Sequence, residues 1–229
     1  MDKFKERWDE SYTNADNFIF YPDYNVIWFV TKFIKRRIGL DEYNYIKHFN
    51  TALDLGCGIG ANLKFLDEYG FDVYGIDLSE IAIDFAKKQF NYERVNLSQK
   101  LLQASVESLP FENEKFDFVI SNGVLDSMPL ETAQKGFAET YRVLRDGGLF
   151  YVSLICADGV TYPPEFSGEV LIKDDHEKGT IQLYYNWTLI NEMIEDKFKV
   201  LECKLTTEKW YVRRSINKRY SLVLKKINF

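Results

Sequence analysis

The segment DLGCGIG, residues 54–60, places three glycines within five positions directly behind an apolar run. Glycine permits tight turns and lets a ligand approach the bare backbone. Two carboxylates accompany this loop: Asp54 opens it, and Asp77 ends the next apolar run along the chain. A carboxylate at the second position can accept both hydroxyl protons of a ribose. The spacing therefore predicts a nucleoside-containing ligand against the glycine loop.

Two classes of ligand fit such a loop. Residues 56–61 match the dinucleotide fingerprint G-x-G-x-x-G/A, which is a weak signal when taken alone. Asp54 distinguishes the two classes, because its carboxylate would lie near a bound pyrophosphate. Like charges about 4 Å apart repel by roughly 4 kcal/mol at an effective dielectric constant of about 20. A ligand with an ammonium and a sulfonium would be attracted instead, which favours S-adenosyl-L-methionine over NAD.

Alternating strands and helices must position these groups. The apolar patterns predict strands over 51–55, 72–76, 100–104, 116–121 and 149–155. They predict helices that begin after Asp23 and end at Gly39, over 61–69, after a Ser79 cap, around 133–144 and over 188–195. Segments 199–206 and 219–226 have no helix between them, so they should form an antiparallel hairpin at one edge of the sheet. The predicted fold is a three-layer α/β/α sandwich with a Rossmann-like, mostly parallel, seven-stranded sheet and an antiparallel edge strand.

No repeat or low-complexity linker divides the chain, so we expect one domain over residues 1–229. Within it, residues 1–50 should form a helical cap or lid, and residues 51–156 the cofactor-binding core. Residues 157–185, which are loop-like to position 179, should form an insertion on the acceptor side. Residues 186–229 should supply a helix and the β-hairpin.

Four motifs together resemble class I S-adenosylmethionine-dependent methyltransferases of the small-molecule acceptor type. The first is DLGCGIG at 54–60, the second is YGIDLS at 74–79, and LPF at 109–111 with FDFV at 116–119 supplies the third and fourth. The resemblance covers about residues 48–156 in register. It implies transfer of a methyl group from S-adenosyl-L-methionine, with S-adenosyl-L-homocysteine as the product.

The resemblance also implies roles for individual positions. Asp54 would bind the methionine ammonium, Asp77 the ribose and Leu78 the adenine. The family often has an acidic residue after its third strand, whereas this chain has Ser105, so the Val106 N–H is left to meet the adenine ring. The cofactor-binding residues expected on this basis are Tyr12, Tyr21, Asp54, Gly56, Cys57, Gly58, Asp77, Leu78, Ser105, Val106, Glu107 and Asn122.

The aromatic N-terminal segment is a candidate lid. RWDESY, residues 7–12, is similar to a W-x-x-x-Y segment in some small-molecule methyltransferases, whose aromatic rings close over the methionine moiety. An aromatic face attracts a cation such as a sulfonium by about 0.5–2 kcal/mol. The alternative is that these rings pack under the first helix as core.

The acceptor chemistry depends on a base. A hydroxyl acceptor needs a general base because its own pKa lies far above 7, whereas an amine must arrive neutral. His176, after the fifth predicted strand, and Asp126, after the fourth, are the candidate catalytic residues. A solvated loop histidine and a helix N-cap are the respective structural alternatives. His48 precedes the first strand, at the wrong edge of the sheet.

Composition narrows the class of partner. The chain has 229 residues and a net charge of −6, which disfavours nucleic acid. It has no run of about 20 apolar residues for a membrane span, and its three separated cysteines predict neither a disulfide framework nor a metal site. We therefore expect a cytoplasmic monomer or homodimer that methylates a small polar acceptor, such as a hydroxyl of a sugar or nucleotide-linked sugar. N-methylation of a small amine and a non-catalytic S-adenosylmethionine-binding protein remain the alternatives.

Overall fold

A computed structural model describes residues 2–91, 98–173, 177–212 and 215–228. Its centre is a seven-stranded sheet in the order β10-β11-β7-β6-β3-β4-β5. The strands are β3 (Thr51–Leu55), β4 (Asp72–Asp77), β5 (Leu101–Gln103), β6 (Phe116–Asn122), β7 (Leu144–Cys156), β10 (Phe198–Trp210) and β11 (Ser215–Lys226). The strands β3 to β7 are parallel, and β11 runs antiparallel to both of its neighbours. The predicted fold class is confirmed, with the reversed strand next to the edge strand β10.

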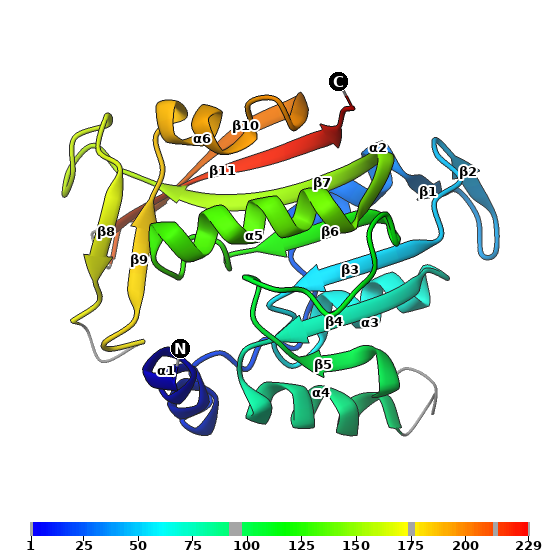
Figure 1. Ribbon diagram of the computed structural model, residues 1–229, viewed down its shortest axis with the longest axis horizontal. Helices are drawn as coiled ribbons and strands as arrows, with labels where there is room; N and C mark the ends of the chain where they lie inside the picture. The colour runs from blue at the N-terminus through cyan, green and yellow to red at the C-terminus, as the bar shows by residue number, and fades with distance from the viewer. Residues whose placement is uncertain (1, 92–97, 174–176, 213–214, 229) are drawn as a thin grey trace.

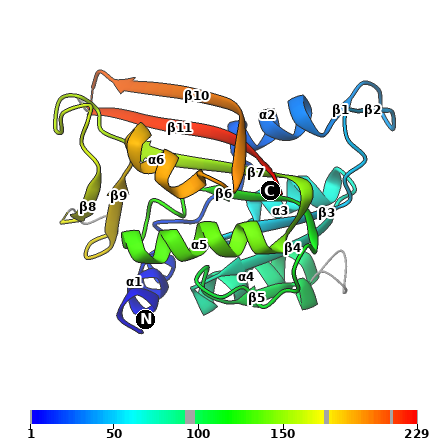
Figure 2. The same ribbon diagram turned by 45° about the horizontal axis from the view of Figure 1, so that its top comes forward.

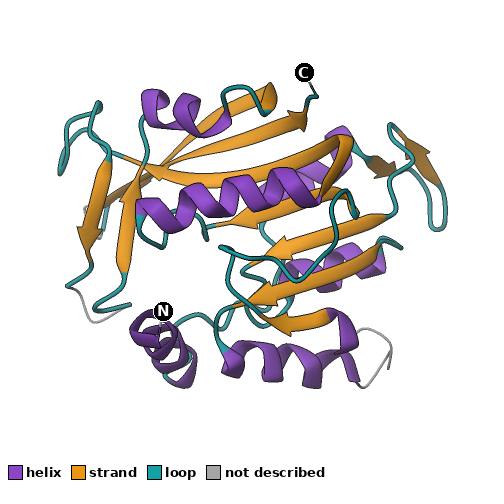
Figure 3. Cartoon of the chain, in the orientation of Figure 1, coloured by secondary structure: helices purple, strands orange, loops and turns teal. Residues whose placement is uncertain are grey.

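Helices cover both faces of this sheet (Figure 3). The helices of the chain are α1 (Asp2–Thr13), α2 (Tyr24–Phe33), α3 (Ala61–Glu68), α4 (Glu80–Asn91), the short 3-10 helix η1 (Ser98–Lys100), α5 (Leu130–Val143) and α6 (Trp187–Ile194), of which α1 lies beyond the ends of the strands. One core cluster contains Phe137 of α5 and Ile190 of α6. A second contains Phe29 of α2, Leu63 of α3 and Ala86 of α4. These two clusters lie on opposite faces of the sheet and form the three layers.

Local signals in the sequence explain several element boundaries. Ser79 caps α4 as predicted, since its Oγ accepts the N–H of Ala82 at 3.2 Å. The expected helix at 188–195 is α6, and the expected C-terminal hairpin is the β10–β11 pair. The predicted helix near 133–144 is α5, but it ends at Val143, and β7 begins at once with Leu144. The glycine pair Gly147-Gly148 predicts a helix end three residues later, but pairing of Leu144 with Phe116 of β6 ends the helix first.

Two predictions about local structure were wrong. The helix after Asp23 was expected to continue to Gly39, but α2 ends at Phe33, and the chain then forms a hairpin of β1 (Lys35–Arg37) and β2 (Tyr43–Tyr45). The Ile34 carbonyl accepts N–H groups from the segment after β2, which replaces a further helical turn. The stretch 157–179, expected to be loop-like, contains β8 (Gly168–Leu171), which pairs with β9 (Ile181–Tyr184).

The arrangement of the strands determines where a ligand can bind. The parallel strands point toward the side of the molecule on which α1 lies (Figure 1). The β1–β2 hairpin lies at the opposite end in both ribbon views (Figures 1 and 2). Within the described residues, no helix is both long and apolar enough to cross a lipid bilayer.

Candidate functional site

A cavity of about 970 Å³ opens at the carboxyl ends of the central strands. This volume lies at the upper end of the range of about 300–1,000 Å³ that is usual for ligand sites. The N-terminal segment, the glycine loop, the loops after β5 and β6, and the β10–β11 hairpin all contribute to its wall. Predicted cofactor residues that line it are Tyr12, Tyr21, Gly56, Cys57, Gly58, Leu78, Ser105, Val106, Glu107 and Asn122. The other two, Asp54 and Asp77, are not among the lining residues, although Asp77 accepts the N–H of Gly58, which lines the cavity.

The loop after β3 has a backbone that requires glycine. Gly56 and Gly58 have φ angles of 63° and 53°, in the left-handed region. A Cβ at Gly56 would lie 2.4 Å from Cγ2 of Val124, and a Cβ at Gly58 would lie 2.8 Å from Oη of Tyr12. The loop thus passes closely between the segment after β6 and α1.

Asp77 holds this loop in place from the end of β4. Its Oδ2 accepts the N–H of Gly58 at 2.9 Å, and its Oδ1 accepts the N–H of Ser79 at 2.8 Å. Burial raises the pKa of Asp77 to about 6, and the N–H donors of Ser79 and Gly58 oppose part of that rise. Each carboxylate oxygen can accept more than one hydrogen bond, so Asp77 retains acceptor capacity.

Asp54, near the end of β3, has a buried carboxyl group with one oxygen that accepts no hydrogen bond from the described residues. Its side chain is 1% exposed, and Oδ2 has no hydrogen-bond partner among the described residues. Burial raises the pKa of Asp54 well above its ordinary value, and the charge of Asp77 adds to the rise. Buried polar groups in proteins are nearly always hydrogen-bonded. A cationic ligand beside the glycine loop would supply the missing partner, so the residues present fit an ammonium and not a phosphate.

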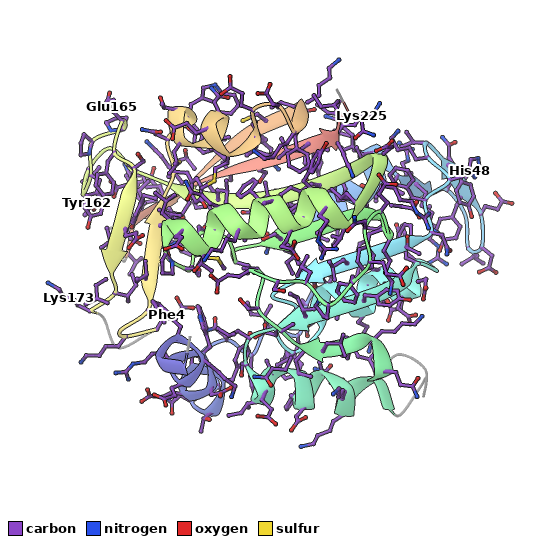
Figure 4. All side chains as sticks on the ribbon, in the orientation of Figure 1. Phe4, His48, Tyr162, Glu165, Lys173 and Lys225 are labelled. Atoms are coloured by element: carbon purple, nitrogen blue, oxygen red, sulfur yellow. The ribbon has the colours of Figure 1, made fainter. Side chains whose placement is uncertain are left out.

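Helix α1 lies against the glycine loop. Its Asp9 accepts a hydrogen bond from the Ser79 hydroxyl at 2.6 Å, which fastens α1 to the start of α4. Tyr12 is only 8% exposed, and burial raises the pKa of its hydroxyl, which keeps it protonated. Phe4 of α1, labelled in Figure 4, also lines the cavity. Tyr21 lines the cavity as well but is 83% exposed, at its mouth.

The turn after β5 is organised by short polar contacts. The Ser105 Oγ accepts the N–H of Glu107 at 3.2 Å. The Glu107 carboxylate pairs with Lys135 of α5 at 3.1 Å. Val106 is buried against α5 and also lines the cavity. The absence of the family's acidic residue at Ser105 leaves a small hydroxyl at this part of the wall.

Of the two predicted base candidates, the structure describes only Asp126. The Asp126 side chain is buried, and its Oδ2 accepts the N–H of Ile155 at 2.7 Å and pairs with Nη2 of Arg219 at 2.5 Å. Asp126 therefore does not cap a helix, and the engagement of its Oδ2 by Ile155 and Arg219 argues against a role as base. His176 lies outside the described residues. The ring of His48 stacks on that of Tyr45, with 5.1 Å between the ring centroids. Figure 4 shows His48 at the opposite side of the molecule from Phe4, which lines the cavity.

Several cavity residues lie outside the segments for which the sequence motifs predict a role. They come from α2 and its approach, from β7, and from the β10–β11 hairpin: Asp23, Asn25, Ser153, Thr206, Glu208, Asn217, Arg219 and Ser221. A signal for the last three exists in the sequence, since polar residues recur at every second position of β11. Period two places such residues on one face of a strand.

Comparison with known proteins agrees with this geometry. Residues 53–152 match the family described as "Methyltransferase domain". The chain is 30% identical over 114 residues to a malonyl-[acyl-carrier protein] O-methyltransferase of Enterobacter lignolyticus, covering 50% of this chain and 42% of that enzyme. The chain thus spans less than half the length of this curated relative.

Solved structures share the fold. A SAM-dependent methyltransferase from Methanosarcina mazei superposes with a TM-score of 0.68 at 21% identity, covering 81% of this chain and 96% of that one. A 1,6-didemethyltoxoflavin-N1-methyltransferase from Burkholderia thailandensis, with bound S-adenosylhomocysteine, superposes with a TM-score of 0.61 at 17% identity, covering 78% and 71%.

Proposed function

We propose that the protein is a class I S-adenosylmethionine-dependent methyltransferase that transfers the methyl group of S-adenosylmethionine to a small polar acceptor. The match of residues 53–152 to the methyltransferase-domain family supports this proposal. The observation that carries the proposal is the buried Asp54 carboxyl with its unpartnered Oδ2 beside the glycine loop. An ammonium lowers the cost of ionising that carboxyl, whereas a pyrophosphate would raise it.

The chain's own residues would bind and orient the cofactor. Asp54 would accept the ammonium, directly or through a water, and Asp77 would accept the ribose hydroxyls. The backbone of Gly56 and Gly58 would lie along the methionine portion, with Leu78 against the adenine. Tyr12 would cover the loop and help to exclude water. When bound, S-adenosylmethionine supplies an electrophilic methyl group on a sulfonium, so positioning of the acceptor accounts for much of the rate enhancement.

For the acceptor, we favour a hydroxyl on a sugar or related metabolite. The part of the wall formed by β7, β10 and β11 is rich in hydroxyl, amide and carboxylate side chains, which supports a polar acceptor. N-methylation of a small amine is the second candidate. The bonds from Asp126 to Ile155 and Arg219 favour it, because they leave Asp126 unsuited to act as a general base. A neutral amine acceptor needs no general base.

The segments around the core would have distinct tasks. Residues 1–50 would form the lid, 157–185 the acceptor-side insertion, and 186–229 the wall that carries β10 and β11. The sequence's three cysteines are all free thiols, two of them buried, which supports a reducing cytoplasmic location. We propose that the protein acts there as a monomer or homodimer.

Calorimetry with S-adenosylhomocysteine and with NAD tests the cofactor assignment. We expect S-adenosylhomocysteine to bind and NAD not to bind. Asp54→Asn should weaken S-adenosylhomocysteine at least tenfold, which corresponds to about 1.4 kcal/mol or more. The matched control is Asp84→Asn, an exposed aspartate on α4 that should leave the affinity unchanged. Tighter binding of NAD, or equal affinities for the Asp54 variant and the wild type, would refute the assignment.

Turnover distinguishes an enzyme from a non-catalytic binding protein. S-adenosylmethionine with a deuterated methyl group can be incubated with a panel of sugars, amino sugars and small amines. The expected result is an acceptor whose mass increases by one labelled methyl group. Binding of the cofactor with no transfer to any member of the panel would favour the non-catalytic alternative.

A further inference from the structure

Buried polar atoms without partners gather on the wall of the cavity formed by β7 and β11. Within the part of the chain that the structure describes, Oη of Tyr151, Oδ1 of Asn217 and Oγ of Ser221 have no hydrogen-bond partner. Asn217 and Ser221 line the cavity directly. Unpartnered buried polar groups are rare in native proteins and require a reason. Because Asn217 and Ser221 lie on the cavity wall, a bound molecule can complete their hydrogen bonds, whereas Tyr151 lies behind them, next to Ser221 and Ser153.

These groups share one face of the sheet. Asn217, Arg219 and Ser221 are spaced by two along β11, so their side chains point the same way. Ser221 is paired with Ser153 of β7, and Tyr151 is two residues before Ser153 on the same face. The Tyr151 hydroxyl lies near Ser153 and Ser221, but it meets hydrogen-bond geometry with neither. We call Asn217, Arg219 and Ser221 the β11 row.

Arg219 is held rigidly in the middle of the β11 row. Its Nε donates to Oγ of Ser153 at 2.9 Å, and its Nη2 donates to Oδ2 of Asp126 at 2.5 Å and to the Ser153 carbonyl at 3.2 Å. Nη1 has no partner among the described residues. A Cβ on Gly123, just after β6, would lie 3.6 Å from Nη2, so the guanidinium lies close to the loop that follows Asn122. The β11 row therefore approaches the cofactor side of the cavity.

The charges around the β11 row disfavour an anion. Asp126 offsets the positive charge of Arg219, which leaves Arg219 as a donor of N–H groups with little net charge. Glu208 of β10 is paired with Asn217 across the hairpin and lines the cavity, as does Asp23 before α2. Lys204, opposite Ser221 in the hairpin, donates to Oδ1 of Asn25 at 2.6 Å and is not among the residues that line the cavity. A carboxylate or phosphate on the acceptor would be repelled by these two carboxylates. A hydroxyl or an amine can donate to the Asn217 oxygen and is not repelled.

From this geometry we propose that the β11 row binds the methyl acceptor, and that the acceptor is a hydroxyl- or amine-bearing molecule without an anionic group. The inference rests on the proposed function, because it assigns the second ligand of the same cavity. It narrows that function, since a nucleotide-linked sugar or a carboxylic acid would not satisfy it. Arg219 and Asn217 act here as residues that position the acceptor.

Three matched hexoses test the inference: D-glucose is neutral, D-glucosamine is cationic and D-glucuronate is anionic. Each is titrated to millimolar concentration into the isotope-labelled protein saturated with S-adenosylhomocysteine. The nuclear magnetic resonance signals of the Arg219 Nε–H and the Asn217 amide report contact with the β11 row. We expect glucose or glucosamine to shift these signals, and glucuronate to bind at least tenfold more weakly.

Variants separate the β11 row from the rest of the fold. Asn217→Ala and Ser221→Ala should each weaken binding of the responding hexose severalfold, with unchanged affinity for S-adenosylhomocysteine. Asn44→Ala, at an exposed position of β2, should change neither affinity. Binding of glucuronate as tight as that of glucose, or no response to any of the three sugars, would overturn the inference. Failure of S-adenosylhomocysteine to bind the wild type would instead refute the proposed function.

Discussion

Replacement of Gly58 by alanine is the sharpest test of the glycine loop. Gly58 has a φ of 53°, and an added Cβ would lie 2.8 Å from Oη of Tyr12. A left-handed conformation costs a residue with a Cβ roughly 1–2 kcal/mol. Tyr12 is buried, so its ring cannot simply turn into solvent. We expect a folded protein with a melting temperature lower by about 2–8 °C, given that 1 kcal/mol corresponds to about 2–4 °C at this chain length.

The loss of cofactor binding should exceed what backbone strain explains. The Gly58 N–H donates to Asp77, so a displaced loop also disturbs the carboxylate proposed to hold the ribose. We expect the affinity for S-adenosylhomocysteine, measured by calorimetry, to fall at least tenfold, or by about 1.4 kcal/mol. Gly147→Ala is the matched control. Gly147 has a φ of 70°, and its Cβ would meet only Cε of Lys225, at 3.5 Å.

The two variants together distinguish strain from contact with a ligand. Gly147→Ala should lower the melting temperature by a similar amount and leave the affinity for S-adenosylhomocysteine unchanged. If Gly58→Ala bound S-adenosylhomocysteine as tightly as the wild type, the loop would be a tight turn without a ligand. The assignment of the cavity to S-adenosylmethionine would then lose its basis in the loop.

Three further predictions concern the surroundings of the loop. Burial raises the pKa of Asp77 to about 6, and the ionised carboxylate accepts the ribose hydroxyls, so S-adenosylhomocysteine affinity should fall as the pH is lowered through about 6. Asp77→Asn should bind weakly, and the pH dependence that it retains should be that of Asp54, whose pKa burial also raises. Amide hydrogen exchange over residues 8–22 should slow when S-adenosylhomocysteine binds, and identical exchange with and without it would make this segment a fixed scaffold. Asp126→Asn should lower the free energy of unfolding by roughly 3 kcal/mol, because it leaves Arg219 without its buried partner, and unchanged stability with lost turnover would restore Asp126 as a base.

Much of the cofactor side could be predicted from the sequence because its signals are local. The glycines lie directly behind an apolar run that can only be a buried strand, and Asp77 ends the next such run. Parallel strands joined by helices bring these two ends together by topology alone. The positions of the loop residues could therefore be predicted without knowledge of any long-range contact. Gly56, Gly58 and Leu78 line the cavity.

The acceptor side depends on contacts between segments distant in the sequence. Ser153 of β7 and Arg219 of β11 are 66 positions apart, and their contact follows from a register that no local pattern fixes. The β1–β2 hairpin also depends on contacts that are not local. Its first strand lies in a segment with a helical pattern, but it pairs with β2, and Lys35 packs against the ring of Phe71. For β11, the period-two recurrence of polar residues was present in the sequence but does not reveal which neighbour covers that face.

Three buried aspartates show why residue type alone could not assign the roles. Asp54, Asp77 and Asp126 all follow or end central strands, and each is almost fully buried. Asp126 has a guanidinium and a backbone N–H on Oδ2, so its charge is compensated inside the protein. Asp77 is bonded to two N–H groups, yet burial still raises its pKa to about 6. Asp54 Oδ2 and Asp126 Oδ1 both lack a hydrogen-bond partner among the described residues, but only Asp126 of the two has an arginine paired with its other oxygen. An ion pair lowers the cost of a buried carboxylate, and an unpartnered one is stable as an anion only when a cation binds. The order of decreasing compensation, Asp126, Asp77, Asp54, is therefore the order of increasing dependence on a ligand, which assigns Asp126 to the structure and Asp54 to the cofactor.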